Sequence, residues 1–266
     1  MDKAKVFEKY KKEEERLIIS KLFDKISLAE KQNKIQSTDF LSPFELKLLT
    51  NVLTMISYHN YKIYGGLENA QRNIIIIYPN KLEEIFENNL FDYNSICNCI
   101  RIKNNSDDFE HKVYLGGLIK LGIRREKIGD IVVFEKGADI IVDKDVTKFL
   151  ISNLQELTRF QKSSIEVVKL EEVTRKEQEF KDLKLTVSSL RLDNVVAELT
   201  KTSRNKAVEI LNQERVFINY KSELKNTKLV KESDLVTIRG VGKFIIYEIA
   251  GNTRSGKVVL KVRKFV

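Results

Sequence analysis

Two cations at the start of a predicted helix carry the clearest chemistry in this sequence. Ser203 has the side chain of a helix N-cap, and the residues after it predict a helix over Arg204–Leu211. Arg204 and Lys206 would then lie in the first helical turn. Free backbone N–H groups and the positive end of the helix dipole already favour an anion there, so the pair predicts a phosphate contact.

The positive charge of the chain is concentrated in its last third. The 266 residues carry a formal charge of +9. Residues 1–68 contain 12 Lys and Arg against 10 Asp and Glu, residues 69–180 contain 17 against 19, and residues 181–266 contain 18 against 9. A Lys-rich surface without function would spread its charge evenly, whereas a domain that binds a polyanion concentrates it. This distribution predicts that residues 181–266 bind nucleic acid.

Other polar residues of the same segment are expected to contribute to RNA binding. In the predicted last strand, Lys261 alternates with apolar residues, which gives the strand one apolar and one largely basic face. Recognition should be of RNA shape and backbone, because side chains cannot read the deep, narrow major groove of A-form RNA. The predicted RNA-binding residues are Arg191, Ser203, Arg204, Lys206, Arg215, Asn219, Lys221, Arg239, Lys243, Lys257 and Lys261.

A glycine-bounded segment near the C-terminus resembles a phosphate-binding P-loop only in part. Residues 251–257, Gly-Asn-Thr-Arg-Ser-Gly-Lys, fit the first seven positions of that motif. The motif then requires Ser or Thr for Mg²⁺ and a following helix, but Val258 begins a predicted strand. We therefore interpret the segment as a turn between two strands, from which Lys257 can still reach RNA.

The residues that most often act in catalysis or hold metals are few here. Cys97 and Cys99 cannot form a disulfide framework, and a metal site would need two further ligands where only His59 and His111 exist. We expect both cysteines to face the core. His111 lies at a predicted helix start without a nucleophile or a carboxylate pair at a telling spacing, so a capping or surface role is predicted. The sequence thus predicts no metal, no cofactor and no enzymatic activity.

These residues would be positioned by three segments that form an α+β protein. Residues 1–60 predict a small helical unit, whose second helix begins with the capping box Ser42-Pro43-Phe44-Glu45. Residues 61–170 alternate strands with helices and predict a compact domain of ferredoxin or RRM type. Residues 171–181 are charged and predict a linker, and residues 181–266 form the RNA-binding domain.

Hydrophobic periodicity and turn residues indicate the elements of the second and third segments. In the second, strands are predicted at Asn73–Tyr78, Ile96–Ile102, Ile131–Phe134, Asp139–Val142 and Ser164–Leu170, and helices at Leu82–Asn88, Glu110–Leu121 and residues 143–154. In the third, a helix after Arg191 and the helix Arg204–Leu211 precede strands at Val216–Asn219, Leu235–Ile238, Phe244–Ile249 and Val258–Val262.

An ordered series of short motifs in the third segment resembles a known RNA-binding module. The motifs are Arg-Leu-Asp at 191–193, Ser-Arg-Asn-Lys-Ala at 203–207, Val-Phe-Ile-Asn at 216–219, Asp234, and Arg-Gly-Val-Gly-Lys-Phe at 239–244. They resemble the alpha-L module named after small-subunit ribosomal protein S four. The sequence departs from it at Glu214 and Ser233, where the module usually has glycine.

The second segment resembles the central domain of the YlmH family. The similar residues are Gly-Gly-Leu-Glu-Asn-Ala-Gln-Arg at 65–72, Tyr-Leu-Gly-Gly-Leu at 114–118 and the stretch 121–131. The resemblance implies an RRM-like domain followed by the RNA-binding module. It also implies binding to large ribosomal subunits that carry peptidyl-tRNA, in the rescue and quality control of stalled translation. The residues that could form a second RNA contact are Arg72, Arg124, Arg125 and Lys127.

Two other classes of function remain open on the sequence. RNA pseudouridine synthases often carry the same module and use a catalytic Asp, but there the module precedes a large catalytic domain, so Asp193 is interpreted as structural. A scaffold that binds proteins through its N-terminal helices is the other alternative. We expect a monomeric, cytoplasmic, non-catalytic protein that binds structured RNA (rRNA and also tRNA) on the large ribosomal subunit and does not enter membranes.

Overall fold

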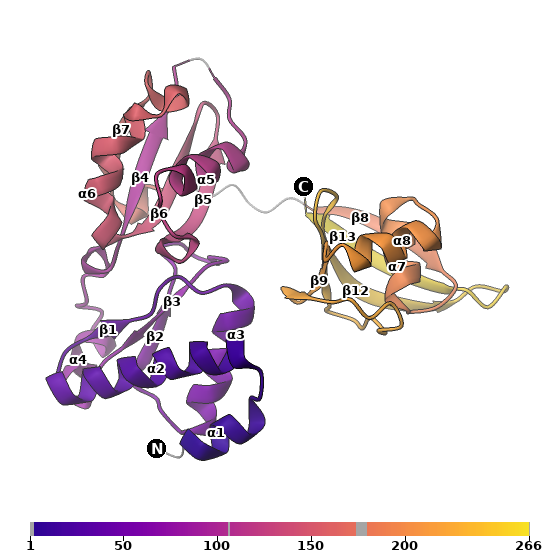
Figure 1. Ribbon diagram of the computed structural model, residues 1–266, viewed down its shortest axis with the longest axis horizontal. Coiled ribbons are helices and arrows are strands. Elements are labelled where there is room, and N and C mark those ends of the chain that lie inside the picture. Colours follow the sequence, from indigo (N-terminus) through magenta and orange to yellow (C-terminus); the bar gives the residue numbers. More distant parts are fainter. Residues whose placement is uncertain (1–2, 106, 174–179, 266) are drawn as a thin grey trace. The chain divides into compact units, whose positions relative to one another are not determined.

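The protein has two compact units. The computed structural model describes residues 3–105, 107–173 and 180–265. Contacts divide the chain into the units Met1–Arg175 and Lys176–Val266 (Figure 1). Most of the predicted linker, residues 171–181, lies outside the described residues. Among the described helices, none combines the length and apolar character that a membrane span requires.

The first unit begins with a layer of helices on a small sheet. The order in its three-stranded sheet is β1-β3-β2, and all pairs are antiparallel. Ser42 and Glu45 form the predicted capping box at the start of the third helix. The elements are α1 (Lys3–Lys9), α2 (Glu13–Gln32), β1 (Gln36–Ser37), α3 (Pro43–Met55), β2 (Tyr61–Tyr64) and β3 (Ile74–Ile77).

The strand β3, which consists of four isoleucines, packs against the helices α2 and α3. Ile75 and Ile77 belong to the core shared with α2 and α3, whereas Ile74 and Ile76 belong to a second core on the opposite face. All four are buried, as expected of a strand covered on both faces. The prediction that residues 1–60 are all-helical is therefore wrong. The two-residue strand β1 pairs with β3, and so short a strand has no periodicity by which it could be detected.

The rest of the first unit is a four-stranded antiparallel sheet with helices on one face (Figure 1). Its strand order is β5-β6-β4-β7, and the chain runs β-α-β-β-α-β through it, which is the ferredoxin-like connectivity. Its elements are β4 (Cys97–Lys103), α5 (His111–Lys120), β5 (Ile128–Phe134), β6 (Gly137–Asp143), α6 (Lys144–Asn153) and β7 (Ser164–Val168), preceded by α4 (Glu83–Glu87).

The face of this sheet opposite α5 and α6 is largely occupied by the protein itself. Cys97, Cys99 and Ile141 of this face pack into one core with Ile74 and Ile76 of β3. Burial raises the pKa of both cysteine thiols to about 12, so neither is a thiolate near neutral pH. The two central strands β4 and β6 thus present none of the aromatic side chains with which RRM domains stack bases.

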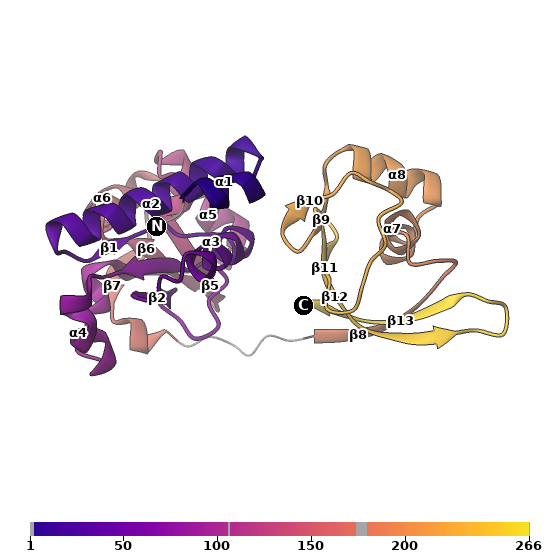
Figure 2. The same ribbon diagram turned by 90° about the horizontal axis from the view of Figure 1, so that it is seen from below.

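The second unit is a six-stranded sheet with two helices on one face (Figure 2). The strand order is β10-β9-β11-β12-β13-β8. Buried residues of alternate strand positions, such as Leu260 and Val262, form one core with Val195 and Val196 of the first helix. The elements are β8 (Phe180–Val187), α7 (Leu192–Thr200), α8 (Arg204–Asn212), β9 (Val216–Ile218), β10 (Lys221–Ser222), β11 (Leu235–Ile238), β12 (Gly242–Asn252) and β13 (Val258–Phe265).

Among the residues of this unit that have a side chain and a left-handed backbone are Glu214 and Ser233, each in the turn before a strand. Glu214 precedes β9 with a φ of 56°, and Ser233 precedes β11 with a φ of 68°. Both angles lie in the left-handed region, which costs a residue with a side chain about 1–2 kcal/mol. These are the positions at which the sequence departs from the glycines of the alpha-L module, and the backbone there has a conformation that suits glycine.

Restoring glycine at these turns should stabilise the protein. We expect Glu214→Gly and Ser233→Gly each to raise the free energy of unfolding by about 0.5–1 kcal/mol, because the relief of left-handed strain exceeds the extra backbone entropy of glycine. Urea denaturation of the full chain, followed by circular dichroism, measures the change. Ser222→Gly, in the regular strand β10, is the control and should lower stability. A loss of stability in both turn variants would contradict the argument from φ.

Candidate nucleic-acid interface

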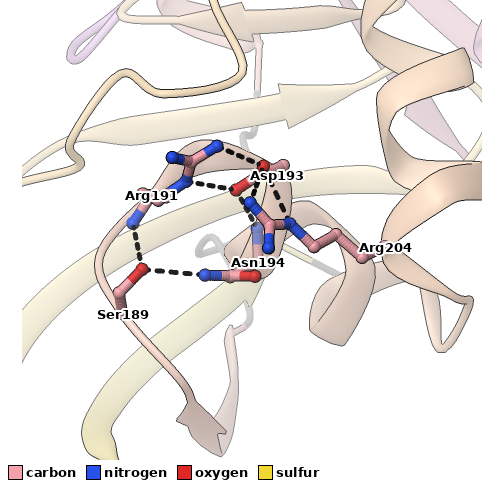
Figure 3. Close-up of polar contacts among 5 residues, drawn as sticks. All are labelled: Ser189, Arg191, Asp193, Asn194 and Arg204. Carbon is pink, nitrogen blue, oxygen red and sulfur yellow. Dashed lines mark hydrogen bonds and ion pairs between the residues drawn. The ribbon is translucent and has the colours of Figure 1, made fainter.

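A buried carboxylate lies between two arginines in the second unit. Arg191 Nη2 lies 2.8 Å and Arg191 Nε 3.2 Å from the Asp193 carboxylate oxygens (Figure 3). Arg204 Nε and Nη2 lie 3.0 and 2.8 Å from Asp193 Oδ2. We call Arg191, Asp193 and Arg204 the Asp193 clamp.

Helix packing brings the three residues of the clamp together. Arg191 is the N-cap of α7 and Asp193 lies in its first turn, while Arg204 is the first residue of α8, directly after the N-cap Ser203. Ser203 Oγ accepts a hydrogen bond from the Lys206 backbone N–H at 3.3 Å, so the predicted cap is present. The two helices pack through a shared core, and this fixes their N-terminal turns beside each other.

Ser189 and Asn194 support the clamp, and the sequence analysis did not single them out. Asn194 Nδ2 donates to Ser189 Oγ at 2.8 Å, and the Arg191 backbone N–H donates to the same oxygen (Figure 3). The backbone N–H of Asn194 also donates to Asp193 Oδ1. Small polar residues around a helix start are common, so nothing in their spacing distinguishes these two from ordinary capping residues.

The electrostatics of the clamp keep Asp193 ionised and the arginines available. Burial alone would raise the pKa of the Asp193 carboxyl, but hydrogen bonds from Arg191 and Arg204 outweigh burial and lower it. The Asp193 side chain is 1% exposed, whereas those of Arg191 and Arg204 are 32% and 54% exposed. Each guanidinium has five N–H donors, and Asp193 engages two of its nitrogens. The clamp therefore aims two rigidly held cations at the solvent, a geometry suited to phosphate.

A second pair of arginines lies where β9 begins and β11 ends. Arg215 Nη2 donates to the Arg239 carbonyl at 2.7 Å, and the Arg239 guanidinium lies 4.6 Å from the centre of the Phe217 ring. Gly240 has a φ of 81°, and a Cβ there would come within 2.9 Å of Arg215 Nη2. This glycine therefore allows the Arg215 side chain to cross the turn.

The remaining predicted RNA-binding residues lie on different surfaces of the second unit. Lys206 is exposed and pairs with Glu209 at 2.6 Å. Asn219 mainly fixes a turn, because its side chain bonds Asp234 and the backbone N–H of Leu235. Lys221 and Lys257 are exposed, in β10 and in the turn before β13.

Lys243 and Lys261 lie on the face of the sheet opposite the helices. Lys243 precedes the buried Phe244, and Lys261 lies between the buried Leu260 and Val262, so both side chains alternate to the outer face. Lys261 also pairs with Glu248 at 2.7 Å. The strand alternation therefore does not support a single RNA surface that includes both the clamp and Lys261.

Three of the four residues predicted for a second RNA contact have partners inside the first unit. The Arg72 guanidinium donates to the carbonyls of Phe40, Arg125 and Ile128. Lys127 pairs with Asp39 at 2.8 Å and with Asp143 at 2.7 Å. The partners of Arg72 and Lys127 come from other parts of the chain, so spacing alone could not reveal these structural roles.

Arg125 and Arg124 complete this group. Arg125 Nη1 donates to the Ile128 carbonyl at 2.6 Å, and burial together with the nearby Arg72 lowers the Arg125 pKa to about 10. Arg124 is exposed. An RNA contact by this cluster stays a prediction, and Arg124 is its most accessible member.

Two kinds of site that the sequence analysis considered, a metal site and a P-loop, can be compared with the described residues. No group of three or more His, Cys, Asp or Glu side chains in the described ranges is arranged to hold a metal ion. The segment 251–257 comprises the last two residues of β12 and the turn to β13, and Thr253 closes this turn by accepting from the Lys257 backbone N–H at 3.1 Å. A strand follows Lys257, so this segment lacks the helix of a P-loop.

The match of part of the chain to a family model agrees with an RNA-binding role. Residues 86–175 match the family described as "Putative RNA-binding domain in YlmH". The chain is 28% identical over 259 residues to "Ribosome-associated protein quality control protein P2" of Bacillus subtilis, covering 95% of each chain. A solved structure, "Cell division protein ylmH" from Streptococcus pneumoniae, is 20% identical with a TM-score of 0.48, covering 61% of this chain and 96% of that one.

Proposed function

Because the chain is a member of the YlmH family, we propose that it is a non-catalytic RNA-binding protein that works on the ribosome. The Asp193 clamp is the observation that supports this most strongly. It holds two exposed arginines on one buried carboxylate, in the segment that contains the whole excess of positive charge. The Bacillus subtilis protein, whose match covers 95% of this chain, is named as a ribosome-associated quality control protein.

We further propose the target and the parts that recognise it. The second unit acts as the alpha-L module and binds folded rRNA of the large subunit through the clamp, Lys206 and the Arg215–Arg239 pair. The first unit acts as an RRM-like domain that contributes a weaker contact near a bound tRNA. Two linked contacts bind a composite target better than either alone, because the second forms at high effective concentration. Such a protein works where ribosomes are, in the cytoplasm, and as a monomer.

The helix side of the second unit is tested by neutralising two cations of α8. Arg204→Gln with Lys206→Gln should weaken binding of the full chain to labelled bulk tRNA about 10- to 100-fold, because each lost phosphate contact contributes on the order of 1 kcal/mol or more. The slope of log affinity against log salt should also fall by about two. Glutamine is chosen because Glu at 204 would face the buried Asp193 carboxylate and disturb the fold.

A matched control removes cations from β8, the edge strand of the sheet in the second unit. Lys181→Gln with Lys184→Gln removes two exposed cations from β8 and should leave tRNA affinity nearly unchanged. Fluorescence anisotropy gives the affinities, and a melting curve for each variant confirms that it is folded. If the β8 variant loses as much affinity as the α8 variant, binding depends on total charge and the clamp is not the docking site.

A further inference from the structure

A groove lined by basic residues lies between α5 and residues 157–160. A cavity of about 460 Å³ lies between α5 and the turn that follows α6. Three of its lining residues are cations, and among the described lining residues none is acidic. The domain around it is near neutral, since residues 69–180 carry 17 basic and 19 acidic side chains, so this local excess is not a consequence of overall composition.

The cations of α5 follow a regular stripe with a glycine at its centre. Lys112, Gly116 and Lys120 are four residues apart, so they lie along one side of the helix, and all three are exposed. Arg159 is exposed on the opposite wall of the cavity. Lys112 also pairs with Glu110 at 2.7 Å, but both side chains are more than 70% exposed, and solvent makes such a pair weak.

The two neighbouring glycines of α5, Gly116 and Gly117, have different surroundings. A Cβ on Gly117 would lie 2.7 Å from the Phe160 ring, so Gly117 lets the helix approach residues 157–160 closely. A Cβ on Gly116 would have no atom within 4 Å. Glycine inside a helix is less stable than alanine, and no contact among the described residues offsets this at Gly116. A bare backbone beside three cations instead suits the close approach of a ligand.

We propose that this groove, formed by Lys112, Gly116, Lys120 and Arg159, is the RNA-docking site of the first unit, and that it binds the sugar–phosphate backbone. The inference rests on the proposed RNA-binding function and gives it a second location. Phosphates would lie beside the lysines and the arginine, while the chain between them crosses Gly116. The groove lies on the helix side of the sheet, whereas the opposite face is filled by the core that contains Cys97 and Cys99.

A substitution at Gly116 separates the ligand argument from a structural one. Gly116→Gln should raise the melting temperature of the full chain by about 1–3 °C, because glutamine favours a helix and its Cβ has open space. The same change should weaken binding to bulk tRNA about three- to tenfold by blocking the groove. Gly117→Ala is the matched comparison and should lower the melting temperature, because its Cβ meets Phe160.

The charges are tested separately, in case a side chain at 116 alters the helix. Lys120→Gln with Arg159→Gln should weaken tRNA binding about tenfold and reduce the salt slope by about two. Lys81→Gln with Lys148→Gln removes two exposed cations of the same unit outside the groove and should change neither. Ultraviolet crosslinking of the full chain to tRNA should give modified peptides that contain residues 111–120 and 157–160.

The outcomes distinguish the groove from the wider function. If the Gly116 and Lys120/Arg159 variants bind tRNA like the wild type while Arg204→Gln with Lys206→Gln does not, the groove proposal is wrong and the RNA-binding function stands. If crosslinks occur only within residues 180–265, the groove proposal is likewise wrong. If the α8 variant also binds normally, the proposed function itself fails.

Discussion

Replacing Asp193 by Asn should lower the free energy of unfolding of the second unit by about 2–4 kcal/mol. The amide keeps the shape of the side chain but removes the charge that holds Arg191 and Arg204. Hydrogen bonds to charged groups contribute about 1.5–3 kcal/mol each, and the total is reduced here because Arg204 is 54% exposed. Denaturation of the full chain, read by hydrogen exchange of amides in residues 180–265, locates the loss in this unit.

The effect of Asp193→Asn should depend on pH in a defined direction. The pKa of Asp193 is lowered in the folded protein, from an ordinary value of 3.8. The ionised carboxylate therefore contributes its full stabilisation above that value and loses it as pH falls through the lower folded pKa. The stability difference between wild type and variant should be constant from neutral pH down to about 5 and shrink in stronger acid.

Glu209→Gln is the control for this experiment. Glu209 also pairs with a cation, Lys206, at 2.6 Å, but both side chains are more than half exposed. Its removal should cost less than about 1 kcal/mol. Equal losses in the two variants would mean that burial of Asp193 adds nothing and that the clamp is an ordinary surface pair.

The second large effect is expected on ribosomes. In gradients of extracts from cells with stalled translation, we expect the tagged wild-type protein to sediment with large subunits, preferentially those that retain tRNA. The Arg204→Gln/Lys206→Gln variant should remain at the top of the gradient, because the salt concentration of the cell already weakens phosphate contacts and the variant has lost two of them. Immunoblotting of the fractions measures the distribution.

Two controls define what this sedimentation shows. The Lys181→Gln/Lys184→Gln variant should still sediment with large subunits, because its cations lie on β8 rather than on the helix side. Nuclease treatment should release the wild-type protein, whereas a scaffold held by protein contacts would stay bound. Wild-type protein found only with small subunits, or not in the ribosomal fractions, would contradict the ribosomal assignment.

Local signals in the sequence predicted the elements around the clamp well. Ser203 was expected to cap α8, and the Ala207 and Leu211 side chains that follow are buried. These features depend on residues within two turns of each other. Asp193 was expected to be structural, but its contact with Arg204 joins two helices. Helix periodicity cannot reveal such a contact, because it depends on how α7 and α8 pack.

The features that the sequence analysis missed depend on long-range partners. Arg72 ends a motif that contains several polar residues, yet its guanidinium donates hydrogen bonds to carbonyls of two other segments. The strand β8 was not predicted, although Leu183, Leu185 and Val187 alternate with polar residues. Only its first two residues lie in the predicted linker, residues 171–181. β1 could not be found at all, since two residues have no period.

Because β8 pairs with β13, the sheet of the second unit cannot be completed until the end of the chain has been synthesised. Phe180 pairs with Phe265 and Val187 with Val258, so the first strand of the unit pairs with its last. During synthesis, β8 leaves the ribosome well before β13 exists, and until then it has no neighbour in the sheet. Such long-range pairings form slowly, and an unpaired strand edge is prone to pair with other chains. Shortening the chain before β13 should therefore produce a nascent protein that aggregates, even though both helices of the clamp are complete.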